Sequence, residues 1–310
     1  MAHLIKLEDY VSRYQSDMQR YPNQFSRMKK DRWKFIKSEW ERLQTPENRE
    51  SSTNRPEGMN QEKGHNFLSQ AVAKMKNWKS TKVEEHDMVT EEERETVDHT
   101  LSLEELKNQF LDDLYHSQLR WASSSLLEES SLHPRYKRDD VLRFFTQQLP
   151  DNYFVMYRPV FFIKKAPIEL EILLITPNEI ICVSLLDGQE HSVFEASSDR
   201  FWTEYIDETR KKRISPLLSL SRMSGVIGPI LEEAGISVPI RKVVFANQGI
   251  IDHRIPGSKV ELIDRRGFES WHEKLKRNPS PIKHQQQKVA QLLLATTHTL
   301  SYHRQSEKEN

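Results

Sequence analysis

Cysteine is almost absent from this sequence: Cys182 is the only one among 310 residues. A single cysteine excludes an internal disulfide framework and a zinc site built from cysteines. Because it lies in an apolar segment, we expect a buried, unreactive thiol. No glycine-rich phosphate loop occurs, so nothing favours ATP binding, and the 12 histidines show no paired metal-ligand spacing.

Long apolar runs are also missing. No stretch approaches the roughly 20 consecutive apolar residues that a bilayer-spanning helix needs. Residues 1–21 mix charges throughout, which is unlike a secretory signal peptide. An excess of one charge is equally absent, because 46 basic residues balance 46 acidic ones, so net charge favours neither nucleic acid nor a membrane as partner. We therefore expect a cytoplasmic protein without a membrane span.

The first residues of the chain carry a regular apolar spacing of three or four positions. It places these residues on one face of a helix: Leu4, Leu7, Val11, Tyr14, Met18 and Tyr21. Pro22 interrupts the pattern, and a second, basic helix with Trp33 and Trp40 on its apolar face is expected over residues 23–43. Residues 1–44 are thus interpreted as a helical hairpin, an arm that could dimerise or contact another protein. The basic residues form either a solvated face or a phosphate contact.

Residues 45–100 are polar and, toward their end, strongly acidic. This composition predicts a linker, with one short helix over residues 67–78. Ser102 and Glu105 have the spacing of a capping box, which predicts the start of a helix there.

The rest of the chain alternates between strand-like and helix-like segments. Helices are expected over residues 102–121, 139–149, 201–208, 217–234, 267–276 and 282–298, and strands over 153–163, 168–175, 179–186, 240–246 and 259–263. This order predicts an α+β fold with a mixed sheet flanked by helices, preceded by the N-terminal helical region. We assign residues 101–276 to one domain and residues 277–310 to a C-terminal helix and tail.

A series of short motifs occurs in a fixed order between residues 136 and 275. The motifs are a helix ending in Leu149-Pro150, an acidic strand at Ile168–Glu171, the turn Thr176-Pro177-Asn178-Glu179, Trp202, Ser215-Pro216-Leu217 opening a long helix, and a buried Val243-Val244-Phe245 strand. In this order and spacing the segment resembles the nuclease-related domain (NERD), a branch of the restriction-endonuclease-like superfamily. The resemblance implies a restriction-endonuclease-like sheet and a metal-dependent phosphodiesterase site.

The catalytic positions of that family fall on Asp139, Glu171, Ser184 and Leu186 of this chain. The last two replace the glutamate and lysine of a Glu-x-Lys motif. A hydroxyl is a poor ligand for a hard dication, and leucine offers neither charge nor a hydrogen bond. The resemblance therefore implies a domain that no longer cuts, with Glu171 as the remaining metal ligand and no cofactor expected.

A restored site is the alternative. Lys164, Lys165, Asp187 and Glu190 are near enough in sequence to supply a displaced lysine and carboxylate, and Mg²⁺ or Mn²⁺ would then be expected. Glu169 and Glu171 should share one face of their strand, which is either solvated or a weak cation site.

Four consecutive basic residues, Arg210, Lys211, Lys212 and Arg213, precede the helix that opens at Pro216. They form either a charged loop or a nucleic-acid contact. Three functions therefore stay open: a degenerate module that binds nucleic acid or protein, an active Mg²⁺-dependent nuclease with displaced residues, and an assembly protein that uses the N-terminal helices.

Overall fold

The computed structural model describes residues 1–44, 101–252, 259–277 and 280–303. Contacts divide the chain into two compact units, residues 1–29 with 109–310 and residues 30–108. The described residues contain six α-helices and a mixed six-stranded sheet, so the predicted α+β class is confirmed. No helix in these ranges is long and apolar enough to cross a membrane.

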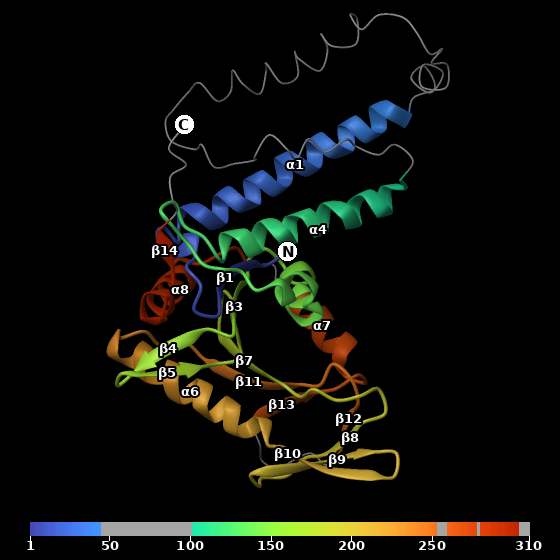
Figure 1. Ribbon diagram of the computed structural model, residues 1–310, viewed down its shortest axis with the longest axis vertical. Helices are drawn as coiled ribbons and strands as arrows, with labels where there is room; N and C mark the ends of the chain where they lie inside the picture. The colour runs from blue at the N-terminus through green and yellow to red at the C-terminus, as the bar shows by residue number, and fades with distance from the viewer. Residues whose placement is uncertain (45–100, 253–258, 278–279, 304–310) are drawn as a thin grey trace, which may run out of the picture. The chain divides into compact units, whose positions relative to one another are not determined.

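The six-stranded sheet of the first unit has the strand order β1-β3-β6-β7-β11-β13 (Figure 1). Its strands are β1 (His3–Leu7), β3 (Phe154–Tyr157), β6 (Ile172–Ile175), β7 (Ile180–Leu185), β11 (Ile240–Phe245) and β13 (Val260–Ile263). Strands β3, β6 and β7 are antiparallel neighbours, whereas β1, β11 and β13 pair in parallel. The predicted turn between β6 and β7 is confirmed, since the Thr176 N–H donates to the Glu179 carbonyl over 2.9 Å.

Helices cover both faces of this sheet. They are α4 (Leu103–Trp121), α5 (Asp140–Gln147), α6 (Pro216–Glu233), α7 (Phe268–Lys276) and α8 (His284–Thr296). Side chains of α4, α5 and α7 share one hydrophobic core with the sheet, in which Phe245 stacks on Trp271 with ring centroids 5.5 Å apart. On the other face α6 packs on β7 and β11 (Figure 1). Cys182 is free and buried, and burial raises the pKa of its thiol to about 12.

The prediction of an N-terminal helical hairpin is wrong. His3–Leu7 is the edge strand β1, a 3-10 turn follows at Arg13–Gln15, and one helix, α1, runs over Arg20–Gln44. All five residues of β1 are buried, including His3 and Lys6. The spacing of its apolar residues therefore does not mark one face of a helix. Pro22 falls in the first turn of α1, where its missing N–H breaks no helical hydrogen bond.

Within residues 30–108, the predicted capping box is confirmed at the start of α4. The Ser102 N–H donates to Glu105 Oε2 over 2.8 Å, and the Glu105 N–H donates to Ser102 Oγ over 3.3 Å. Trp40 of α1 donates its ring N–H to the Leu101 carbonyl over 2.9 Å. The short helix expected at 67–78 and nearly all of the acidic segment lie outside the described residues.

Two predicted long strands are each divided into two. Residues 153–163 form β3 and then β4 (Val160–Ile163), and residues 168–175 belong to β5 (Ala166–Glu169) and then β6. Strands β4 and β5 pair with each other as a separate hairpin, because the chain leaves the large sheet between Tyr157 and Ile172. A further small pair joins β14 (Tyr302–His303) to β2 (Glu128–Glu129).

A second sheet has the order β10-β9-β8-β12. Its strands are β8 (Val193–Glu195), β9 (Phe201–Ile206), β10 (Thr209–Ile214) and β12 (Ile250–Asp252). The helix predicted over residues 201–208 is therefore wrong. Burial alternates along β9, with Trp202, Glu204 and Ile206 buried between more exposed neighbours, which is the period of a strand.

The β4–β5 hairpin turns through Lys164 and Lys165, which have φ angles of 50° and 71°. Left-handed backbone is strained for residues with a Cβ, and Asn-Gly is the favoured pair in such two-residue turns. We expect the double substitution Lys164→Asn, Lys165→Gly to raise the free energy of unfolding by about 1 kcal/mol in urea titrations. The control Lys164→Ala, Lys165→Ala removes the same charges but keeps both Cβ atoms, and an equal gain there would contradict this explanation.

Candidate functional site

Glu171 lies between β5 and β6, and both of its carboxylate oxygens have partners on β7. Oε1 accepts a hydrogen bond from Ser184 Oγ over 2.7 Å, and Oε2 accepts one from the Leu185 N–H over 2.6 Å. Ser184, which the resemblance aligns with a metal-binding glutamate, thus donates a hydrogen bond to Glu171. Glu169 does not share a strand face with Glu171, because it ends β5 in a different sheet and is exposed.

Asp139 is the N-cap of α5. Its Oδ1 accepts from the Leu142 N–H and its Oδ2 accepts from the Tyr157 hydroxyl, both over 2.9 Å. Burial and the adjacent Asp139 carboxylate raise the pKa of Tyr157, so this phenol remains a donor. Tyr157 pairs with Ile172, the residue after Glu171. Asp139 therefore lies on the sheet face that α5 covers, whereas Glu171 meets Ser184 on the face of α6, so the structure does not bring these two acids together.

Leu186, which the resemblance aligns with a catalytic lysine, is a buried residue that follows β7. Its N–H donates to the Phe245 carbonyl over 2.9 Å, which extends the pairing with β11. The position contributes backbone hydrogen bonding and apolar packing rather than a charge.

A pocket of about 450 Å³ opens beside Glu171. It is lined by Glu171, Ser184, Leu185, Ile214, Ser215, Pro216, Leu218, Ser219 and Arg222. The residues considered for a restored site, Lys164, Lys165, Asp187 and Glu190, do not line it. The first two lie in the β4–β5 turn, and the other two are exposed.

The wall opposite Glu171 is the start of α6. Ser215 is its N-cap and Ser219 lies in its first turns; both are buried, and neither hydroxyl has a hydrogen-bond partner among the described residues. Arg222 contributes the positive charge of this wall. The pocket therefore offers hydroxyls and a guanidinium to a polar or anionic group.

The side chains that line this pocket do not fit the divalent metal that the resemblance implies. Mg²⁺ and Mn²⁺ take hard oxygen ligands, with carboxylates foremost. Glu171 is the one carboxylate lining the pocket, and it is already hydrogen-bonded on both oxygens. Among the residues that the structure describes, no three His, Cys, Asp or Glu side chains gather as a metal site.

The basic cluster 210–213 forms most of β10 rather than a loop. Lys211 and Arg213 pair across the hairpin with Glu204 and Trp202. Arg213 Nε donates to Glu204 Oε2 over 2.5 Å, and Ser192 Oγ donates to Glu204 Oε1 over 2.7 Å. Burial alone would raise the pKa of Glu204, but the hydrogen bonds from Arg213 and Ser192 hold it below its usual range.

The other face of the hairpin carries Arg210 and Lys212 together with Phe201 and Tyr205 of β9. Sequence reasoning missed the two aromatic residues, because residues 201–208 were predicted to be helical. The signal that could have placed them is the enrichment of Phe201–Ile206 in aromatic and β-branched residues, which are typical of strands.

Comparison with known proteins yields little. No family model matches the chain, and no solved structure matches it significantly. The chain is similar to an RNA 2',3'-cyclic phosphodiesterase of Geobacillus stearothermophilus, with 32% identity over 127 residues. The match covers 38% of this chain and 36% of that protein, so the chain spans about a third of the length of this curated relative.

Proposed function

We propose that the protein is a nucleic-acid-binding module on a nuclease-related domain that does not cleave phosphodiesters. The expected absence of cleavage is supported by one observation. Both oxygens of Glu171 accept hydrogen bonds from β7, one of them from Ser184, which stands where the family has a metal-binding glutamate. Leu186 stands in place of the lysine and is buried.

The nucleic-acid-binding role is supported by the surface that leads away from Glu171. Ile214, the last residue of the basic strand β10, lines the pocket together with Glu171 and Arg222. Ser215 and Leu218 also line an adjoining hollow of about 650 Å³, which Arg200 borders. A polynucleotide could therefore run from the basic hairpin past the start of α6, with guanidinium groups near its phosphates.

The relative named above acts, by its name, on an RNA phosphodiester. Since the match spans about a third of that protein, it supports RNA as the first nucleic acid to test and does not assign an activity to this chain.

The test uses the purified full chain with labelled RNA and DNA oligonucleotides. We expect binding that weakens by at least about tenfold when salt rises from 50 to 200 mM, because phosphate contacts release counterions. We expect no cleavage in Mg²⁺ or Mn²⁺, and no opening of a terminal 2',3'-cyclic phosphate.

Two results would overturn the proposal. Cleavage that is lost in Glu171→Ala would show an active centre and favour the restored-nuclease alternative. The absence of RNA or DNA binding at 50 mM salt would remove the binding role. Glu171→Gln is the matched variant for binding, because it removes the charge but keeps an acceptor for Ser184 and Leu185.

A further inference from the structure

The exposed face of the β9–β10 hairpin, here called the hairpin face, combines aromatic and basic side chains. From β9 it carries Phe201, Thr203 and Tyr205, and from β10 the cross-strand partners Ile214, Lys212 and Arg210. The exposed fractions are 46% for Phe201, 38% for Tyr205 and 68% for Ile214. Large apolar side chains this exposed, side by side on a sheet, indicate a contact surface.

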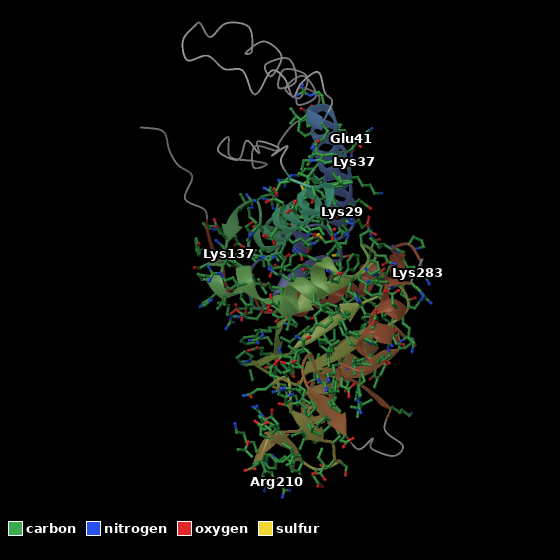
Figure 2. The ribbon with its side chains drawn as sticks, turned by 90° about the vertical axis from the view of Figure 1, so that its right-hand side faces the viewer. Lys29, Lys37, Glu41, Lys137, Arg210 and Lys283 are labelled. Atoms are coloured by element: carbon green, nitrogen blue, oxygen red, sulfur yellow. The ribbon has the colours of Figure 1, made fainter. Side chains whose placement is uncertain are left out.

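Each ring on the hairpin face has an arginine beside it. The guanidinium carbon of Arg210 lies over the Tyr205 ring at 5.8 Å from its centroid, and that of Arg200 lies over the Phe201 ring at 5.7 Å. Lys212 pairs with Thr203, midway between the two rings. In the part of the chain that the structure describes, neither Arg210 nor Lys212 forms an ion pair. Figure 2 shows Arg210 at the outer end of the hairpin.

The opposite face of the hairpin holds these side chains in place. Trp202 is fully buried and donates its ring N–H to the Ser197 carbonyl over 2.8 Å, and Glu204 is fixed by Arg213 and Ser192. On the hairpin face itself, the Tyr205 hydroxyl donates to Glu195 Oε2 over 2.9 Å, which orients the Tyr205 ring. The contact surface is therefore built on two paired strands rather than on a loop.

We propose that the hairpin face binds single-stranded nucleic acid, with bases stacked on Phe201 and Tyr205 and the phosphates between them held by Lys212, Arg210 and Arg200. This inference deepens the proposed function and rests on it. Phe201 and Tyr205 are four residues apart on one strand, roughly 13 Å, so each ring would take its own base. Positive charge along exposed rings matches the phosphates and π-faces of an unpaired strand.

The hairpin face suits a single strand better than a duplex, and neighbouring acidic residues limit where the strand can lie. The bases of a duplex are stacked on each other and cannot lie on protein rings, so a duplex would leave both aromatic side chains unused. The acidic residues of the same sheet face, Glu195 and Asp252, lie on β8 and β12. They confine an anionic ligand to the β9–β10 half of the sheet.

The experiment measures the dissociation constants of labelled single-stranded and blunt-ended duplex oligonucleotides by fluorescence anisotropy. We expect the wild type to prefer the single strand. Phe201→Ala and Tyr205→Ala should each weaken single-strand binding by about 5- to 140-fold, the range for loss of one stacked base. The double variant Arg210→Gln, Lys212→Gln should lower the slope of log affinity against log salt by about 1.4, or 0.7 per phosphate contact.

Lys211→Gln is the matched control. It removes the same charge from the same strand, but from the face that pairs with Glu204, so it should change affinity by less than about twofold. Thermal melts of each variant identify any that fails to fold, and Phe201→Leu, which keeps an apolar side chain without a ring, serves as the second variant for stacking.

The results separate this inference from the proposed function. Single-strand binding that survives in the ring variants, or that Lys211→Gln weakens as much as the double variant Arg210→Gln, Lys212→Gln, would overturn the hairpin face but leave a nucleic-acid-binding protein. Equal affinity for the duplex would overturn it likewise. No binding of any nucleic acid would end both proposals. Ring-dependent binding to phosphatidylserine vesicles with none to oligonucleotides would identify a membrane surface instead.

Discussion

Raising the pH from 7 to 9 will make the protein harder to unfold, because Lys6 is an ammonium group buried in the sheet. Lys6 is fully buried in β1, where its Nζ donates to the Tyr10 carbonyl over 2.6 Å and to Thr299 Oγ1 over 2.9 Å. Burial lowers the pKa of Lys6 to about 7, and the charge of Asp9 offsets only part of this.

Proton linkage gives the direction in which the free energy of unfolding changes with pH. The folded pKa of about 7 lies below the usual 10.5, so between these values the unfolded chain binds more protons than the folded one. Stability therefore rises with pH in this window, by roughly 3–5 kcal/mol if the whole window were traversed. Above pH 9 the buried Cys182 thiol opposes the trend, because its pKa is raised to about 12 and the unfolded chain ionises first.

Lys6→Met isolates this contribution. We expect the variant to be more stable than the wild type at pH 7 by about 1–4 kcal/mol, since a buried charge that Asp9 compensates only in part is replaced by an apolar side chain of similar length. The excess should shrink toward pH 9. Urea titrations at pH 6, 7, 8 and 9 measure both effects, with Lys137→Met removing an exposed charge as control. Parallel pH profiles for wild type and Lys6→Met would contradict the assignment to Lys6.

The second large effect is expected at Gln118 of α4, which is fully buried against the edge strand β1. Its Oε1 accepts from the Leu4 N–H and its Nε2 donates to the Ala2 carbonyl, both over 2.6 Å. The glutamine thus supplies the hydrogen bonds that a further strand would make. Gln118→Leu leaves two buried backbone groups unpaired, so we expect it to lower the free energy of unfolding by about 2–5 kcal/mol in urea titrations.

Gln285→Leu is the matched control for this substitution. Gln285 makes one exposed hydrogen bond, to the Ser237 carbonyl, so the same replacement there should change stability by less than about 0.5 kcal/mol. Hydrogen exchange at the Leu4 amide should accelerate in Gln118→Leu alone. Similar losses of stability in the two variants would show that Gln118 does not hold the strand edge.

Local signals predicted those parts of the fold that depend on local structure. The capping box at Ser102 and Glu105, the turn that starts at Thr176 and the apolar run of β11 each lie within a few neighbouring residues. Strand β1 escaped prediction because its partners come from far along the chain, Phe154 in the sheet and Gln118 on the helix. Burial on both faces removed the period of two that would have marked it.

The candidate site was predicted only in part, because some of its features depend on residue identity and others on pairing between strands. Residue identity alone indicates that Ser184 and Leu186 cannot supply the charged groups of a metal-dependent site. The hydrogen bond between Ser184 and Glu171 depends on the register of β6 against β7, in which Ile172 pairs with Val183. The hairpin face was missed because the bulky residues of 201–208 are compatible with either a helix or a strand when read alone.

The parallel pairing of β1 with β3 also shapes how the chain is made. His3 pairs with Phe154, so β1 leaves the ribosome about 150 residues before its neighbour exists. During that interval five residues that are buried in the native state have no sheet to join, and closing so long a loop slows the step that finally places them. Chaperone binding to nascent chains should therefore concentrate on this segment and end once β3 has emerged.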